Sequence, residues 1–267
     1  MPPRINYIIC MFIGKRRNRS IASVEMVQMQ LDYLQDNNIP LTKVTVVCNL
    51  DEAEHYQIIL GNMKKFINDY YTELEFIPRL NQGFSYRAWS EAINRELESN
   101  NDYDYYFLIE DDCLPARKDF IDVFLEPMKG KVCYVCQRLS VSGPKHAGMS
   151  SGILCGKASR KVYDKMGSVL RTTAGLTYAS AQHDQRYFLE NLIDMGYELT
   201  DCSHLASMPF YEKFSDEKVG RIIEYGDPDL PPVLIPIIRK EYWNVITTTV
   251  YDEIWERITK TTYEGAE

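Results

Sequence analysis

Three consecutive carboxylates, Glu110, Asp111 and Asp112, follow a short apolar run and are the residues of this sequence best suited to bind a metal ion. Like charges a few ångströms apart disfavour joint ionisation, so the cluster needs a cation or basic groups nearby. All-oxygen ligands favour a hard ion, Mg²⁺ or Mn²⁺, which usually shares its coordination shell with substrate phosphates. The triplet therefore predicts a divalent cation and a diphosphate ligand.

A purely structural role is the alternative interpretation of the triplet. Asp is favoured near a helix N-terminus by the helix dipole and is common in loops. Pro115, which suits the first turn of a helix, follows shortly after. The local string favours neither interpretation over the other.

The elements that must position the triplet alternate between continuous apolar runs and segments of helical periodicity. The apolar runs predict buried strands over residues 6–13, 43–50, 74–77, 105–109, 132–135 and 153–155. Apolar residues at helical spacing predict helices over residues 24–34, 52–70, 84–97, 115–128, 183–195 and 251–258. This alternation predicts an α/β fold with a mainly parallel central sheet and helices on both faces.

The loops that follow the predicted strands are where a ligand should bind. In open α/β sheets, ligands lie beyond the carboxyl ends of the strands. The segments after the first, second and fourth strands run from Gly14 to Arg19, from Asn49 to Asp51, and over the acidic triplet. We expect these segments to share one edge of the sheet. The Gly- and Ser-rich stretch 140–152 predicts a loop that touches substrate.

The composition narrows the classes of partner. The formal net charge of −8 argues against broad electrostatic capture of nucleic acid or anionic lipid. The apolar run from Ile5 to Ile13 is shorter than the roughly 20 residues that span a bilayer, so we expect no direct membrane insertion and a cytoplasmic location. The seven cysteines are an odd number and lie mostly in apolar runs, which predicts reduced core thiols.

A longer pattern gives the triplet a context. Asn81-Gln82-Gly83, a helix with Ala92 and Asn94, a tyrosine-rich strand, the triplet and Leu114-Pro115 resemble, in this order, the core of family-2-like inverting glycosyltransferases of the A-type fold. The resemblance covers roughly residues 5–200, judged by the order of elements. In that family the acidic cluster, of D-x-D type, holds the donor ribose and the metal that bridges the diphosphate.

The resemblance implies roles for individual residues. Asp112 is the expected direct metal ligand, with Glu110 and Asp111 at the ribose and the metal. Residues after the first two strands contact the nucleotide in that family. They are here Gly14 and Arg19 after the first strand and Asn49 or Asp51 after the second.

Two departures from the family pattern stand out. Glu110 replaces the usual first Asp of the cluster, and the family's A-R-N string appears as Arg87-Ala88-Trp89, shifted by one residue. Arg87 is expected either to reach the diphosphate or to be a surface charge on its helix.

The resemblance also implies the residues on the acceptor side. Family members carry an acidic residue at the start of a late helix, which deprotonates the acceptor hydroxyl, and Asp184 holds the matching position. An ordinary helix N-cap is the alternative role for Asp184. His183 is expected to bind the acceptor or to orient Asp184, and His204 to supply an additional metal ligand. Gly152 lies in a small-residue turn that would let the backbone approach a sugar ring.

The sequence therefore predicts a metal-dependent glycosyltransferase that moves a sugar from a UDP- or GDP-linked donor to a hydroxyl of a glycan or glycoconjugate, with inversion. An inactive nucleotide-sugar or glycan-binding module and a sugar nucleotidyltransferase are the alternatives. We expect one domain over residues 1–267, with a nucleotide-sugar half at 1–115, an acceptor half at 116–204 and a helical elaboration at 205–267. The transferred sugar, the acceptor and the oligomeric state do not follow from the sequence.

Overall fold

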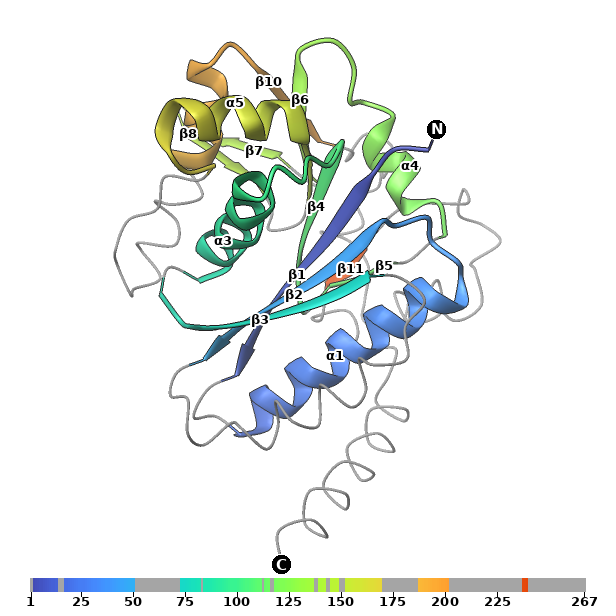
Figure 1. Ribbon diagram of the computed structural model, residues 1–267. Coiled ribbons are helices and arrows are strands. Elements are labelled where there is room, and N and C mark those ends of the chain that lie inside the picture. The colour runs from blue at the N-terminus through green and yellow to red at the C-terminus, as the bar shows by residue number, and fades with distance from the viewer. Residues whose placement is uncertain are drawn as a thin grey trace, which may run out of the picture.

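A seven-stranded sheet forms the centre of the computed structural model (Figure 1). Its strands, in spatial order, are β10 (Glu198–Asp201), β6 (Val132–Cys136), β9 (Gly152–Cys155), β4 (Tyr105–Glu110), β1 (Ile5–Ile13), β2 (Lys43–Leu50) and β3 (Glu73–Leu80). The structure describes residues 2–13, 17–50, 73–82, 84–111, 113–115, 118–136, 139–142, 145–148, 152–169, 187–201 and 237–239.

The sheet is mainly parallel, which confirms the predicted fold class. β1 pairs in parallel with β2 and β4, β2 pairs in parallel with β3, and β6 pairs in parallel with β10. β9 is the exception, since it runs antiparallel to both β4 and β6. Every residue of β2 and all but one of β1 are buried, as expected for parallel strands covered on both faces.

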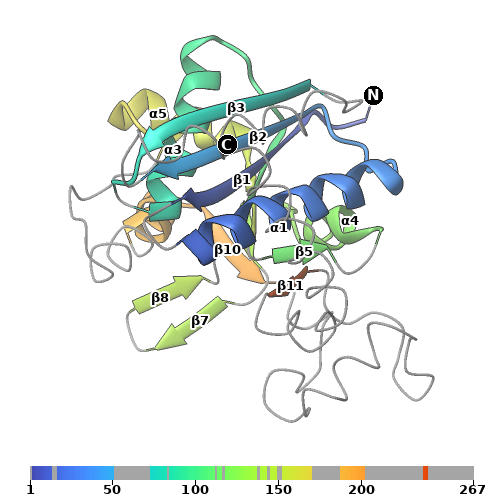
Figure 2. The same ribbon diagram turned by 90° about the horizontal axis from the view of Figure 1, so that it is seen from below.

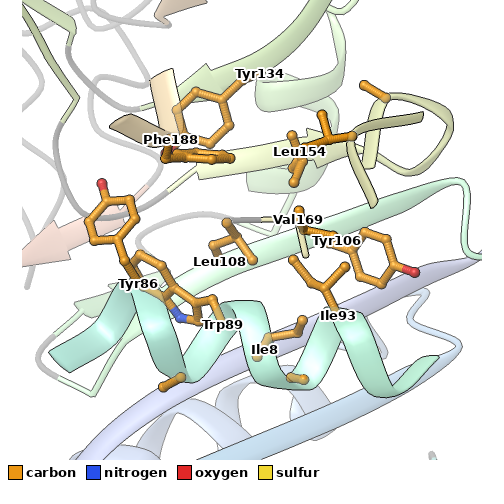
Figure 3. Packing of buried hydrophobic residues seen from close by; sticks show 14 of the residues in the cluster. Ile8, Tyr86, Trp89, Ile93, Tyr106, Leu108, Tyr134, Leu154, Val169 and Phe188 are labelled. Carbon is orange, nitrogen blue, oxygen red and sulfur yellow. The ribbon is translucent and has the colours of Figure 1, made fainter. Parts of the chain in front are cut away.

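Helices cover both faces of the sheet. α1 (Arg17–Asp36) and α4 (Phe120–Leu125) pack on one face, where Val27 and Phe124 join the core. α3 (Phe84–Glu98), α5 (Gly156–Met166) and a helical segment at 187–194 pack on the other, around Trp89 (Figure 3). No helix in the described part of the chain is long and apolar enough to cross a membrane.

The second half of the chain differs from the sequence prediction in several places. Pro115 does not open a helix, because it ends the short strand β5 (Cys113–Pro115), and the following helix, α4, begins only at Phe120. The stretch 140–152, expected to be a loop, contains most of a hairpin of β7 (Leu139–Ser142) and β8 (Lys145–Gly148). Periodicity also missed α5, whose sequence is rich in lysine and arginine.

The carboxyl-terminal region contributes one strand, which pairs with β5. β11 (Ile237–Arg239) pairs antiparallel with β5, which itself lies beside α1 (Figure 2). β11 lies within the carboxyl-terminal elaboration expected at 205–267, and that division of the chain stays a prediction. The predicted helices 52–70 and 251–258 lie outside the described residues.

Gly156, the first residue of α5, has no space for a side chain. A Cβ built on Gly156 would lie 1.8 Å from the backbone carbonyl oxygen of Tyr103. The Gly156 N–H also donates to the carbonyl of Asp104, at 2.8 Å. Because the obstacle is backbone, a side chain here must move β9 and α5 away from the loop that precedes β4.

We predict that Gly156→Ala destabilises the protein by about 2–3 kcal/mol, as overpacking does in well-packed cores. Urea unfolding measures the change. Lys157→Ala, at the adjacent exposed position of α5, is the control and should change the stability by less than about 0.5 kcal/mol. Equal stability of the two variants would contradict the tight contact.

Candidate functional site

The carboxyl ends of β1, β2, β3 and β4 meet at one edge of the sheet, as parallel pairing requires. The register places Asn49 between Phe12 of β1 and Arg79 of β3. On the other side of β1, Glu110 lies opposite Cys10. Residues from two of the three predicted segments, Asn49 and Glu110, are thus brought to the edge where open α/β sheets bind ligands.

A line of polar contacts runs along this edge on the face covered by α3. Arg79 donates from Nη1 to Oδ1 of Asn49, and Asn49 donates from Nδ2 to Sγ of Cys10 at 3.3 Å. Ser85, in the first turn of α3, lies beside the Cys10 thiol and donates to Oε1 of Glu110 at 2.6 Å. The contacts link the ends of all four strands to the N-terminus of α3.

Arg79 is the functional candidate that the sequence prediction missed. Its side chain is 8% exposed, and it donates from Nε to Glu91 of α3 at 2.8 Å and from Nη2 to the carbonyl of Gln82 at 2.9 Å. The predicted third strand ended at Ile77, whereas β3 continues to Leu80. Strand alternation from the buried Ile77 would have placed Arg79 on the same face.

Alternation also separates two members of the acidic triplet. Glu110 is half-buried and faces Ser85 of α3, whereas Asp111 is 6% exposed and accepts a hydrogen bond from Ser23 of α1. The N–H of Asp111 donates to the carbonyl of Cys10 at 2.9 Å. The two carboxylates therefore point to opposite faces of the sheet and not to one shared ligand.

The groups at this edge suit a hard cation. Burial, with repulsion from Glu110 and Asp111, raises the pKa of the Cys10 thiol well above its usual value. Burial and the charge of Asp111 raise the pKa of Cys48 as well. Both cysteines therefore stay protonated, so the donors at the edge are carboxylate, amide and hydroxyl oxygens, which Mg²⁺ and Mn²⁺ prefer.

Asp112 and His204, the other two predicted metal ligands, lie outside the described residues. Among the residues that the structure does describe, no three His, Cys, Asp or Glu side chains form a group able to hold a metal ion. The metal site predicted from the triplet therefore needs Asp112, and it stays a prediction.

An aromatic group brings the helical segment 187–194 close to the same edge. Phe188 packs against Tyr86 of α3, with ring centroids 5.9 Å apart, and edge-on against Tyr134 of β6 at 5.2 Å (Figure 3). Tyr86 is the neighbour of Ser85 in the sequence and packs on Trp89, whose indole N–H donates to the carbonyl of Ile109 at 3.2 Å. The segment that follows Asp184 is therefore anchored beside the N-terminus of α3.

Internal packing explains the glycine at position 152. A Cβ on Gly152 would lie 2.7 Å from both the Tyr134 hydroxyl and the carbonyl oxygen of Val135. The small residue is thus required by the fit of β9 against β6. Contact with a sugar ring, which the sequence analysis expected here, stays a prediction.

The remaining predicted site residues divide into two groups. Arg87 is described, and it lies half-buried in α3, two residues after Ser85. The backbone of Arg19 belongs to α1, but its side chain is outside the described residues. Also outside are Gly14, Asp51, His183 and Asp184.

We predict that Arg79→Leu destabilises the protein by about 1–3 kcal/mol, because Asn49 and Glu91 lose a buried hydrogen-bond donor. Urea unfolding is the measurement. Arg95→Leu is the matched control, since Arg95 also pairs with Glu91 but is 52% exposed and should contribute less than about 1 kcal/mol. A loss for Arg79→Leu no larger than the control would show that Arg79 does not hold this edge together.

No model of a protein family and no curated protein matches the sequence. Solved structures do align with the chain. A mannosyltransferase from Pyrobaculum calidifontis, in complex with GDP-Man and Mn²⁺, aligns with a TM-score of 0.48 and 14% identity over 75% of this chain. This chain covers 55% of that protein, about half of its length.

Two further structures give similar alignments. Glucosyl-3-phosphoglycerate synthase from Mycobacterium tuberculosis, in complex with Mn²⁺, UDP and phosphoglyceric acid, aligns with a TM-score of 0.43 and 10% identity over 75% of this chain and 69% of its own. TarS of S. aureus, residues 1–349, aligns with a TM-score of 0.42 and 14% identity over 93% of this chain and 73% of its own.

Proposed function

We propose that this protein transfers a sugar from a UDP- or GDP-linked donor to a hydroxyl of a glycan or glycoconjugate. One observation carries the proposal. Asn49 and Glu110, far apart in the sequence, lie on the same face of the same sheet edge, since Asn49 donates to Cys10 and Cys10 lies opposite Glu110. This is the edge at which open α/β sheets bind nucleotides.

Glu110 and Asp112 are the proposed ligands of Mn²⁺ or Mg²⁺. The carboxylate of Asp111 is turned toward Ser23 of α1, so we propose that it supports the site and does not coordinate the metal ion. A bound cation supplies Lewis-acid stabilisation of the departing diphosphate.

The protein's own groups bind the rest of the donor. Asn49 is proposed to contact the nucleotide base, because Arg79 and Cys10 hold its amide in one orientation at the end of β2. The N-terminus of α3 lies at the edge through the contact between Ser85 and Glu110, and the positive end of its dipole suits a phosphate. Arg87, in the same turn, adds positive charge.

Asp184 is the proposed general base of the transfer. It precedes the helical segment 187–194, which Phe188 holds against Tyr86 at the N-terminus of α3. Asp184 takes the proton of the acceptor hydroxyl as that oxygen attacks the anomeric carbon. The bond from this carbon to the diphosphate breaks on the opposite side, and the configuration inverts.

Donor binding is the first test. We predict that UDP or GDP, together with Mn²⁺ or Mg²⁺, raises the thermal unfolding midpoint. At a ligand concentration a hundred times its dissociation constant, the free energy of unfolding should rise by about 2.7 kcal/mol. Glu110→Gln and Asp112→Asn should abolish the metal-dependent part of the shift. Asp122→Asn, which changes an exposed carboxylate of α4, should retain it. Absence of a shift with any nucleotide and metal would refute the proposal.

Turnover separates the proposed activity from its alternatives. We predict that Asp184→Asn lowers the rate of sugar transfer by about 10²–10⁴-fold and leaves donor binding nearly unchanged, since general-base catalysis has that magnitude. An inactive binding module would bind donor without turnover in the wild type. A nucleotidyltransferase would release pyrophosphate from a nucleoside triphosphate and a sugar phosphate.

A further inference from the structure

One side chain of α1, that of Gln30, binds the backbone at Glu110 and Asp111. Gln30 is fully buried, and its Nε2 donates to the carbonyl of Glu110 at 3.0 Å and to the carbonyl of Asp111 at 3.1 Å. An amide nitrogen carries two hydrogens, so each carbonyl receives one. A single side chain thus fixes two successive peptide groups at the point where β4 ends.

Tyr7 fixes the orientation of this amide. Its hydroxyl donates to Oε1 of Gln30 at 3.2 Å, which leaves Nε2 facing the two carbonyls. The Tyr7 ring is stacked on Phe107, with centroids 5.2 Å apart, and its edge contact with Phe120 anchors it further. Burial raises the pKa of Tyr7 well above its usual value, so the hydroxyl remains a hydrogen-bond donor.

Ser23, on the same helix, completes the support. Its hydroxyl donates to Oδ2 of Asp111 and accepts a hydrogen bond from the N–H of Phe12 at 3.3 Å. Asp111 is thereby fixed through its side chain, through its carbonyl and through its own N–H, which donates to Cys10. Beyond the triplet, Cys113 begins β5, which pairs with β11.

We propose that Gln30 and Ser23 are positioning residues, which set the direction in which Glu110 and Asp112 leave the sheet toward the cation. The inference rests on the proposed function and goes beyond it, because neither residue touches the ligand. Both side chains are buried, and each is hydrogen-bonded to the end of β4. Support of this kind around metal ligands commonly changes affinity by about 10- to 100-fold.

The test is the affinity for Mn²⁺, measured by the loss of the free-ion electron paramagnetic resonance signal, at saturating UDP and, in parallel, GDP. Gln30→Met keeps the length of the side chain and removes both hydrogen bonds to the carbonyls. It should weaken Mn²⁺ binding by about 10- to 100-fold, with the stoichiometry of binding unchanged. Ser23→Ala should weaken it in the same direction.

Gln28→Met is the matched control. Gln28 lies on the same helix, is partly exposed and donates to Asp32 at 2.7 Å, so its replacement should leave Mn²⁺ affinity unchanged. The unfolding midpoint of each variant is measured alongside. A residue that served only the fold would lower the midpoint, and the fraction of competent protein, without changing the dissociation constant of the folded molecules.

The outcomes are distinct. Wild-type affinity in both Gln30→Met and Ser23→Ala overturns the positioning role and leaves the proposed function intact. If Gln30→Met does not fold, Ser23→Ala decides alone, and an unchanged dissociation constant overturns the inference. A wild-type protein that binds no Mn²⁺ with either nucleotide overturns the proposed function, and the positioning role with it.

Discussion

The parallel pairing of β1 with β2 on one side and β4 on the other is the constraint on which the rest of the structure depends. It brings the ends of strands that are separated by whole helices to one edge. Because these strands are buried on both faces, their registers cannot slip without exposing apolar side chains or burying polar ones. Asn49, Cys10 and Glu110 meet at this edge for that reason.

The alternation of side chains along β4 gives the carboxylates of Glu110 and Asp111 different partners. Successive side chains of a strand point to opposite faces, so Glu110 is directed to α3 and Asp111 to α1. Glu110 and Asp111 therefore have different surroundings. Glu110 faces the N-terminus of α3 at the edge, while Asp111 is a buried acceptor that ties the end of β4 to α1.

α3 is fixed to the sheet at both of its ends, which keeps its N-terminus at the edge. Near its far end, Glu96 is buried and accepts a hydrogen bond from the equally buried Lys43 at 2.7 Å. Burial alone lowers the pKa of Lys43, but hydrogen bonds and charges from Glu75 and Glu96 outweigh it and raise the pKa. At the near end, Ser85 contacts Glu110, and in the middle of the helix Glu91 contacts Arg79.

The sequence by itself determined the α/β class, the positions of the strands in the first half and the edge at which chemistry is proposed, because parallel buried strands appear as continuous apolar runs. It ended β3 three residues early, because Pro78 and Arg79 interrupt the apolar run. It did not give the β5–β11 pair, since that pairing joins residues more than a hundred positions apart. Nor did it identify Arg79, Gln30 or Tyr7 as supports of the site, because their partners are backbone carbonyls and side chains of other elements. Only the tertiary structure decided these contacts, because a hydrogen bond between distant segments produces no periodic pattern in the amino-acid sequence.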